Sequence, residues 1–344
     1  MKNFLLLIFV LYNFACVYAQ TITRNGLDFE LSTNPNEAYV VGRASGSTAT
    51  DIIIPSVVTD NNVQYFVRKI KPSAFENNQL TSVIIPNSVA SIGKNAFKTN
   101  NLTSVTIPDS VSSISEAAFA FNQLTSVTMP DNLNTISALA FSRNQLTNIT
   151  IPDSVTSIGT SAFSINQLTS LTIPTSVTSI DAEAFYGNLL ESVTIPNSIT
   201  SIGADVFYDN KLTSVTIPDS VTSIRPGAFK VNQLTSVNIP NIDASIDDTA
   251  FDEGVIIERE PTLSAEDFDL NTNENILFEN PVGSVLDIFT QTSINSISIY
   301  NSTGQVVLKS NSIENLNVNG LQSGVYIIRF ETDQGFISNR MIKK

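Results

Sequence analysis

Residues 144–165 read NQLTNITIPDSVTSIGTSAFSI, and close copies of this stretch fill the middle of the chain. Prolines recur every 22 residues along these copies, at Pro86, Pro108, Pro130, Pro152, Pro174, Pro196, Pro218 and Pro240. Phenylalanines keep the same interval, at Phe75, Phe97, Phe119, Phe141, Phe163, Phe185, Phe207, Phe229 and Phe251. A unit this short cannot bury its apolar side alone, so neighbouring units must stack around one shared core. The repeat therefore predicts a solenoid.

Each unit carries the pattern of one short, half-buried strand. Val105 and Ile107 alternate with Ser104 and Thr106, so the apolar pair should face the core and the hydroxyls should face outward. Pro108 has no N–H to donate into a sheet, and it stands where the strand should end. We expect 22-residue coils whose strands form parallel β ladders, joined by short turns or helical turns.

An asparagine column accompanies the phenylalanine column. Its members lie two residues before the leucine that opens each strand segment, at Asn78, Asn100, Asn122, Asn144, Asn166, Asn188, Asn210 and Asn232. An amide side chain carries two donor hydrogens and an acceptor oxygen. We expect these side chains to be buried and to satisfy backbone groups of their own and adjacent coils, while the phenylalanine rings stack in the core.

The composition disfavours several kinds of chemistry. The chain has 344 residues, 15% of them charged, and a net charge of -14. That charge repels phosphate backbones and anionic lipid, so we expect no nucleic acid and no membrane surface as partner. There is no His, and Cys16 is the only cysteine. Ser-His-Asp and Cys-His nucleophiles, disulfides, and His or Cys metal sites are therefore not expected, and neither is a cofactor.

Residues 1–19 have the features of a secretory signal peptide. Lys2 precedes an apolar run over residues 4–12, and residues 17–19 (VYA) form a cleavage pattern. The run is too short for a bilayer, which needs about 20 residues, so no transmembrane segment is expected. Cys16 could instead end a lipoprotein box, but Asn13 stands where such boxes carry an aliphatic residue. We therefore expect an exported chain.

The repeat also sets the expected domain boundaries. The turn-forming residues 32–36 lie between two apolar segments, which predicts a hairpin in an N-terminal β cap over residues 20–50. The solenoid should cover residues 51–252, because Asp243 replaces the aliphatic residue of its column and indicates the end of the stack. Residues 253–275 are acidic and aperiodic, which is typical of a linker.

Residues 276–344 have a different character from the repeat. Short alternating apolar segments lie near residues 285–289, 294–300, 305–308, 325–330 and 336–342. This spacing is typical of a small antiparallel β-sandwich.

The 22-residue unit resembles the BspA-like leucine-rich repeat, whose units carry L-x-x-V-x-I-P followed by S-V-x-x-I-G-x-x-A-F. The match covers residues 51–252. One departure is that the family usually closes its unit with a Cys and a longer turn, whereas this chain uses Asn-Gln-Leu. The resemblance implies a β-rich leucine-rich-repeat solenoid in a surface or secreted protein that binds host or matrix proteins or other cells.

The C-terminal segment resembles the type A sorting domain of type IX secretion in Bacteroidetes. The matching motifs are residues 277–282 (LFENPV), 299–305 (IYNSTGQ) and 321–326 (LQSGVY), with two lysines at the end of the chain. Glu279 replaces the first proline of the family's P-N-P motif. The resemblance implies that residues 276–344 are handled by the outer-membrane type IX machinery, and that the protein is then attached to the surface or released. Gly304 and Gly324 would also serve as plain turn residues.

Catalysis would have to rely on carboxylates, as in glycosidases. The candidates follow the prolines of successive coils, at Asp109, Asp131, Asp153 and Asp219. Thr175 and Asn197 fill the same column, which is what a side-chain-capped turn needs and not what a unique acid/base pair needs. Residues 267–271 match a calcium loop weakly, because Thr272 and Phe278 stand where that loop requires Gly and Glu. We expect neither an enzyme nor a metal site.

The outward hydroxyls of the strands form the predicted binding face for an unknown protein or glycan ligand. Its residues are Ser104, Thr106, Ser126, Thr128, Thr150, Ser170, Thr172, Ser214 and Thr216. A passive role in a surface layer or matrix remains an alternative. The regular hydroxyl array also resembles ice-binding solenoids, although those need a flat face.

Some turns match a modification pattern. The turns match the short pattern of O-glycosylation in Bacteroidetes, which is Asp followed by Ser or Thr and then an aliphatic residue, at Ser110, Ser154, Ser220 and Thr249. The same Asp-Ser pair is also what the turn requires.

Overall fold

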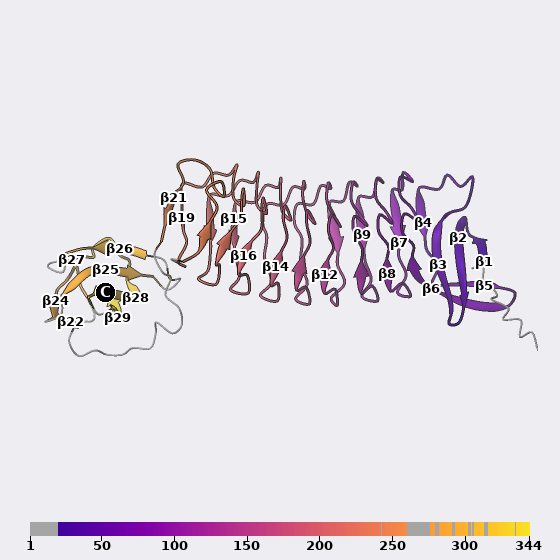
Figure 1. Cartoon of the computed structure of the whole chain (residues 1–344). Coiled ribbons are helices and arrows are strands. Elements are labelled where there is room, and N and C mark those ends of the chain that lie inside the picture. Colours follow the sequence, from indigo (N-terminus) through magenta and orange to yellow (C-terminus); the bar gives the residue numbers. More distant parts are fainter. Residues whose placement is uncertain are drawn as a thin grey trace, which may run out of the picture. The chain divides into compact units, whose positions relative to one another are not determined.

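The computed structural model describes residues 20–241, 243–259, 276–278, 282–290, 293–301, 304, 306–312, 316–333 and 335–344. The chain divides into two compact units, Met1–Glu258 and Arg259–Lys344. The predicted signal peptide, residues 1–19, lies outside the described residues, and so does the weak calcium-loop match at residues 267–271. The first unit is the solenoid, and the second is the C-terminal module (Figure 1).

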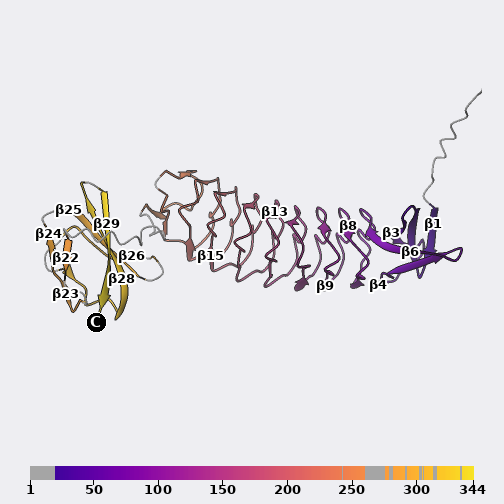
Figure 2. The ribbon, with the colours of Figure 1, turned by 90° about the horizontal axis from the view of Figure 1, so that it is seen from below.

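An antiparallel cap covers the N-terminal end of the solenoid. Strands β1 (Gln20–Arg24), β2 (Leu27–Thr33) and β3 (Asn36–Arg43) form a meander, and β2 with β3 is the predicted hairpin. A second hairpin pairs β5 (Val57–Asp60) with β6 (Val63–Ile70). Strand β6 also pairs in parallel with β3 of the cap and with β8 (Ser91–Ile92) of the coils. It therefore joins the cap to the coils (Figure 2).

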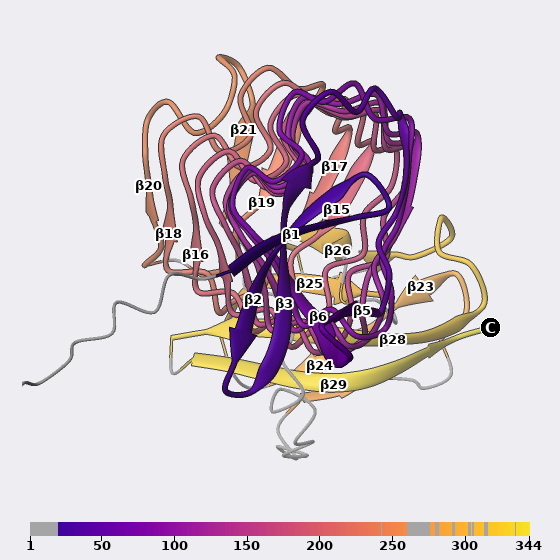
Figure 3. The same ribbon diagram turned by 90° about the vertical axis from the view of Figure 1, so that its right-hand side faces the viewer.

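Short parallel strands form two sides of the coils, although the strand side has no regular strand at residues 148–150 and 170–172. The strand side contains β4 (Asp51–Ile53) paired with β7 (Ser82–Ile84), β9 (Ser104–Thr106) with β11 (Ser126–Thr128), β15 (Ser192–Thr194) with β17 (Ser214–Thr216), and β19 (Ser236–Asn238) with β21 (Ile256–Glu258). The second side contains β8 (Ser91–Ile92), β10 (Ser113–Ile114), β12 (Thr135–Ile136), β13 (Ser157–Ile158), β14 (Ser179–Ile180), β16 (Ser201–Ile202), β18 (Ser223–Ile224) and β20 (Ser245–Ile246). Viewed along the stack, the coil outlines shift steadily from the indigo to the orange end (Figure 3).

The third side of each coil, which we call the Phe–Asn side, has an irregular backbone that still bonds from coil to coil. Ser161 and Ile165 adopt positive φ angles of 54° and 53°, and the N–H of Phe163 between them donates to the carbonyl of Ala184 in the next coil (2.9 Å). No helix occurs among the described residues, so of the two kinds of turn expected from the sequence the coils there use short turns.

The phenylalanine rings form the predicted stack inside the coils. Consecutive rings from Phe75 to Phe251 have centroids between 5.2 and 5.7 Å apart and are nearly parallel. Phe163 is fully buried, as are most members of the column. The rings lie in one continuous hydrophobic core that runs from Ile22 to Phe251, so the coils share a core as the repeat predicts.

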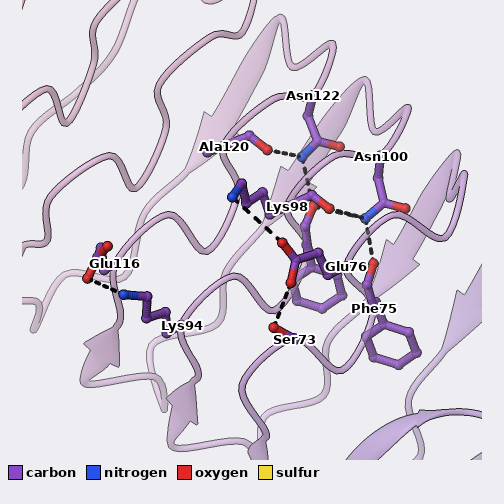
Figure 4. Close-up of polar contacts among 10 residues, drawn as sticks. Ser73, Phe75, Glu76, Lys94, Lys98, Asn100, Glu116, Ala120 and Asn122 are labelled. Atoms are coloured by element: carbon purple, nitrogen blue, oxygen red, sulfur yellow. Dashed lines mark hydrogen bonds and ion pairs between the residues drawn. The ribbon is translucent and has the colours of Figure 1, made fainter.

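The asparagine amides from Asn100 to Asn210 are buried and join neighbouring coils, as predicted, whereas Asn78 and Asn232 at the ends of the column are half-buried. Asn100 donates through Nδ2 to the carbonyls of Phe75 in the preceding coil (2.7 Å) and Phe97 in its own coil (2.9 Å). Its Oδ1 accepts the N–H of Leu80 (2.9 Å). Asn122 repeats the arrangement one coil further on (Figure 4). Each amide therefore satisfies main-chain groups that would otherwise be buried without a partner.

The solenoid extends beyond its predicted end at residue 252. Strand β21 lies in what the sequence suggested was the linker, and it pairs with β19 in parallel. Its partner residues are 20 positions apart, as in Ser236 and Ile256, whereas the partners in the other central ladders are 22 apart. The final coil is therefore shorter than the 22-residue repeat, and the spacing of the repeat does not predict it.

The C-terminal unit is antiparallel, as predicted. A four-stranded sheet has the order β26 (Val306–Ser310), β25 (Ile294–Tyr300), β28 (Gly324–Thr332) and β29 (Gly335–Lys343). Two small ladders pair β22 (Ile276–Phe278) with β24 (Ile288–Thr290), and β23 (Val285–Leu286) with β27 (Leu316–Asn317). Side chains from both parts, including Ile276, Leu286 and Phe330, form one core separate from that of the solenoid.

Candidate functional site

The strand side brings the predicted face residues into register. Ser104 pairs with Ser126, and Thr106 pairs with Thr128, while the valines between them point inward. Ser214 and Thr216 occupy the same positions in β17. Thr150, Ser170 and Thr172 lie in coils whose segments are not assigned as strands, yet their side chains are exposed as well. All nine predicted residues are exposed on the solenoid surface.

The face contains residues that the sequence prediction left out. Ser192 and Thr194 in β15 pair with Ser214 and Thr216 and complete the column. Ser82, Asn148 and Ser236 are equally exposed members of the serine position. The fixed interval of the repeat would have found all of them, because each stands a whole number of units from a predicted residue.

Exposed isoleucines lie at both ends of the face, whose middle is hydroxylated. Ile53 and Ile84 occupy the threonine position in the first two coils and are 68% and 59% exposed. At the other end Ile256 occupies the serine position and is 63% exposed. Large apolar side chains this exposed are unusual in a soluble protein when they gather on one face. The face is therefore mixed in chemistry along its length.

A hollow lies where the apolar end meets the hydroxylated middle. It has a volume of about 520 Å³ and spans β7, β9 and β11. Its polar lining residues are Ser82, Asn87, Ser104, Thr106, Asp109 and Thr128, and Ile84 supplies an exposed apolar wall. Such a lining offers several hydroxyl donors and acceptors, one amide, one carboxylate and one apolar patch to a ligand.

The edge of the face beside this hollow is fixed by a carboxylate. The hydroxyls of Ser82 and Thr81 both donate to Oδ1 of Asp51, at 2.6 and 3.0 Å. These hydrogen bonds, that of Ser82 first, hold the pKa of Asp51 below its usual value because they favour the charged form. The Ser82 hydroxyl is thereby oriented before any ligand arrives.

The aspartates that follow the prolines lie in exposed turns. Asp109 accepts through Oδ1 the main-chain N–H of Asp131 in the next coil (3.1 Å), which is turn chemistry across coils. Asp153 and Asp219 are also exposed. Within the described ranges no group of at least three His, Cys, Asp or Glu side chains gathers in a way that could hold a metal ion.

The serines of the possible glycosylation pattern have partners inside the solenoid. The Ser110 hydroxyl donates to the carbonyl of Val89 (2.7 Å), that of Ser154 to Leu133 (2.8 Å), and that of Ser220 to Ile199 (2.9 Å). All three side chains are half-buried. Thr249 is exposed, and its hydroxyl donates to Asp247 (2.6 Å). Glycosylation at the serines therefore stays a prediction that competes with these bonds.

The third sorting motif is described in full, and the other two in part. Tyr326 donates through its hydroxyl to the carbonyl of Gln322 (2.8 Å), which closes the turn before β28. Gly304 has φ +80° and no atom near the position of a Cβ, so its role as a turn residue follows from its backbone alone. Residues 279–281, 302–303 and 305 of the first two motifs lie outside the described residues.

Comparison with protein families agrees with this architecture. The BspA type leucine rich repeat region matches residues 54–167 and 164–264 in 6 copies, which is more than half of the chain. The chain belongs to the BspA-type leucine-rich repeat family. The secretion system C-terminal sorting domain matches residues 277–344. Both resemblances inferred from the sequence are thereby confirmed.

Solved structures similar to this chain include several bacterial repeat proteins. A leucine rich cell surface protein from Faecalibacterium prausnitzii is 23% identical, with 72% of this chain and 96% of that chain covered and a TM-score of 0.41. The pneumococcal vaccine antigen PcpA is 18% identical over 71% of this chain and 89% of its own, with a TM-score of 0.44. A leucine-rich repeat protein from Bacteroides ovatus is 20% identical over 69% and 90%, with a TM-score of 0.33. No curated protein matches the chain.

The two family matches determine where this BspA-type protein works. The sorting domain indicates export by type IX secretion, and the repeat is that of secreted or cell-surface proteins. Among the described residues there is no helix with the length and apolar character needed to cross a membrane. The protein is therefore a secreted or cell-surface leucine-rich repeat protein.

Proposed function

We propose that the strand face binds a protein or glycan ligand outside the cell, and that binding centres on the hollow over β7, β9 and β11. The observation that carries the proposal is the lining of this hollow, in which exposed hydroxyls, Asp109 and Ile84 converge in one place. A ligand with many hydroxyl or amide groups and a small apolar portion complements such a surface.

Ligand capture on this face would be distributed over several coils. Ser and Thr lose little side-chain entropy on binding, and each hydroxyl can donate and accept a hydrogen bond. The matching positions repeat at the interstrand spacing of about 4.8 Å, so a chain-like ligand can contact successive coils in the same way. Affinity should therefore increase with the number of coils contacted. No residue in the hollow provides the imidazole or thiol that nucleophilic catalysis commonly uses.

The arrangement of the coils gives less support to ice binding. The assigned strands on this side fall into separate two-stranded ladders, and the coil outlines shift along the stack (Figure 3). An array that matches a crystal surface needs one flat, regular plane. The mixed chemistry of the hollow also favours recognition of a molecule over a purely passive role in a surface layer.

The test compares two charged variants of the whole chain. The first replaces Thr106 and Thr128 with Lys in the hollow, and the matched control replaces Thr178 and Thr200, which are exposed on the second side, with Lys. Both would be screened against immobilised neutral polysaccharides and against a library of extended peptides. We expect at least about a tenfold loss of binding for the hollow variant only, because two charges would be placed where the ligand must be desolvated.

Equal loss in both variants would contradict a site in the hollow. Failure of the unmodified protein to bind any member of either panel would favour the passive surface role. Binding to polysaccharides alone or to peptides alone would identify the ligand class.

A further inference from the structure

The sorting domain contains an arginine whose position is unusual for a charged side chain. Arg329 lies in the middle of β28, between Ile328 and Phe330, which are both fully buried in the core of the unit. Because successive side chains of a strand point to opposite faces, Arg329 lies on the outer face of the four-stranded sheet. It nevertheless is only 9% exposed.

The guanidinium of Arg329 has hydrogen-bonding capacity that the domain does not use. Its Nε and Nη1 atoms are both buried and have no hydrogen-bond partner in the structure. Buried charged groups in proteins are almost always paired, because an unmet donor loses its water without compensation. A charge retained in such a position points to a partner that arrives from outside the domain.

The surroundings orient the guanidinium without satisfying it. Its central carbon lies 3.9 Å from the centre of the Phe336 ring, so this ring, which is itself 55% exposed, covers one face of the planar group and offers its N–H groups no acceptor oxygen. Ser298 and Ser338 are its direct cross-strand neighbours on β25 and β29. Glu331, two residues along the same strand, instead accepts a hydrogen bond from Ser296 (2.6 Å).

The same face has an excess of positive charge around this position. Lys309 is the cross-strand neighbour of Ser298, and Arg340 is that of Ile327, so both lie on the face that carries Arg329. The whole chain is strongly acidic, with a net charge of -14. Three cations and one carboxylate, that of Glu331, lie on this face, whereas acidic residues outnumber basic ones in the whole chain.

We propose that Arg329 is a recognition residue that binds a carboxylate of the outer-membrane export machinery. A guanidinium fork matches a carboxylate in shape and can donate two parallel hydrogen bonds to it. The serine hydroxyls of the neighbouring strands stand beside this position and can donate to the same anion. This recognition of the sorting domain is independent of the ligand proposed for the solenoid.

The first test replaces Arg329 with Met in the full chain, which keeps the length of the side chain and removes the charge. We expect an unchanged or higher melting temperature, because a buried unpaired charge is replaced by an apolar group. Export to the cell surface should fall at least about tenfold, because a desolvated charge-assisted contact is lost. Arg329→Lys, which keeps the charge without the fork, should also reduce export.

Arg340→Met is the matched control, since it removes one positive charge from the same face. We expect its export to stay within about twofold of the unmodified chain, as for a peripheral charge. Normal export of Arg329→Met, or an equal loss in both variants, would overturn the proposal. A lower melting temperature of Arg329→Met would also overturn it, because that result would show a partner within the chain.

The second test measures anion binding directly with acetate as the probe. The Nε–H resonance of Arg329 in the labelled full chain would be followed during titration with sodium acetate, with sodium chloride at equal ionic strength as reference. We expect a saturable shift at Arg329 that is absent at Arg340. The absence of a saturable shift, or a stronger response to phosphate than to acetate, would contradict a carboxylate site.

Discussion

The strand side and the Phe–Asn side of the same coil follow different rules. On the Phe–Asn side the interior positions hardly change from coil to coil, and side-chain amides and main-chain groups are both used up in bonds between coils. On the strand side the outward positions vary, from Asp51 and Ile53 at one end to Ile256 and Glu258 at the other, while main-chain hydrogen bonds form the ladders. One side fixes the stack, and the other is open to substitution.

The largest effect should come from the amide column. Asn166 donates to the carbonyls of Phe141 (3.0 Å) and Phe163 (3.1 Å) and accepts the N–H of Leu146 (3.1 Å). Asn166→Leu leaves these buried groups without partners, so we expect a loss of about 4 kcal/mol or more in the free energy of unfolding, measured in urea. Asn148→Leu is the control on the strand side and should change stability by less than about 0.5 kcal/mol. Equal costs would erase the distinction between the sides.

The ring column should be nearly as sensitive. Phe163 is fully buried and stacks on Phe141 and Phe185 at 5.7 and 5.6 Å. We expect Phe163→Ala to cost about 3 to 5 kcal/mol, because it removes apolar contacts and leaves a cavity between two rings. Phe121, which is 44% exposed, provides the control, and its replacement by Ala should cost less than about 1 kcal/mol. A loss under about 1 kcal/mol at Phe163 would show that the column is not essential to the core.

Substitutions at the positive-φ positions of the Phe–Asn side should change the free energy of unfolding by a smaller amount. Gly187 has φ +63°, and a Cβ there would lie 3.5 Å from Ile165, so there is room for a methyl group. Gly187→Ala should therefore cost about 1 kcal/mol through backbone strain alone. Val231, with φ 58° at the equivalent position, supplies the converse test, because Val231→Gly relieves the strain of a β-branched residue. Destabilisation by both changes would mean that side-chain contacts matter more than φ.

The smallest effect is expected for the outward threonines. Thr150 is exposed, so Thr150→Lys should change the urea midpoint by an amount equivalent to less than about 0.5 kcal/mol. A larger loss would show that the outward column contributes to folding, and the face could then no longer be altered without affecting the stack.

The sequence predicted the parts of the fold that depend on the repeat. The phenylalanine stack and the bonding role of the asparagines follow from a fixed interval and from the chemistry of each side chain. The positive φ angles on the Phe–Asn side could not be predicted from the sequence, because Ile165 and Val231 are β-branched residues that disfavour positive φ. Contacts between successive coils override that local preference.

The ends of the solenoid could be predicted less well than its middle. In the first ladder Ile52 pairs with Val83, 31 positions away, because the β5–β6 hairpin is inserted between them. In the last ladder Val237 pairs with Ile257 after a coil that is two residues short. In the sorting domain, the strand around Arg329 alternates apolar and polar residues, and such a pattern predicts an exposed arginine. The burial of Arg329 could therefore not be predicted from the sequence. The hollow is formed by residues of successive coils together, so the sequence of a single unit does not predict it.

The buried asparagine amides bond to their own coil and to the preceding coil, which affects how the number of coils can change in evolution. The side-chain hydrogen bonds of Asn166 reach its own coil and the preceding one, and those of Asn188 repeat this one coil later. Duplication or loss of one 22-residue coding segment therefore recreates the same junction on both sides. Unequal recombination between coding repeats should therefore produce alleles that differ in coil number, with the cap, the last coil and the sorting domain unchanged. The protein can thus change its length by whole coils without losing its core.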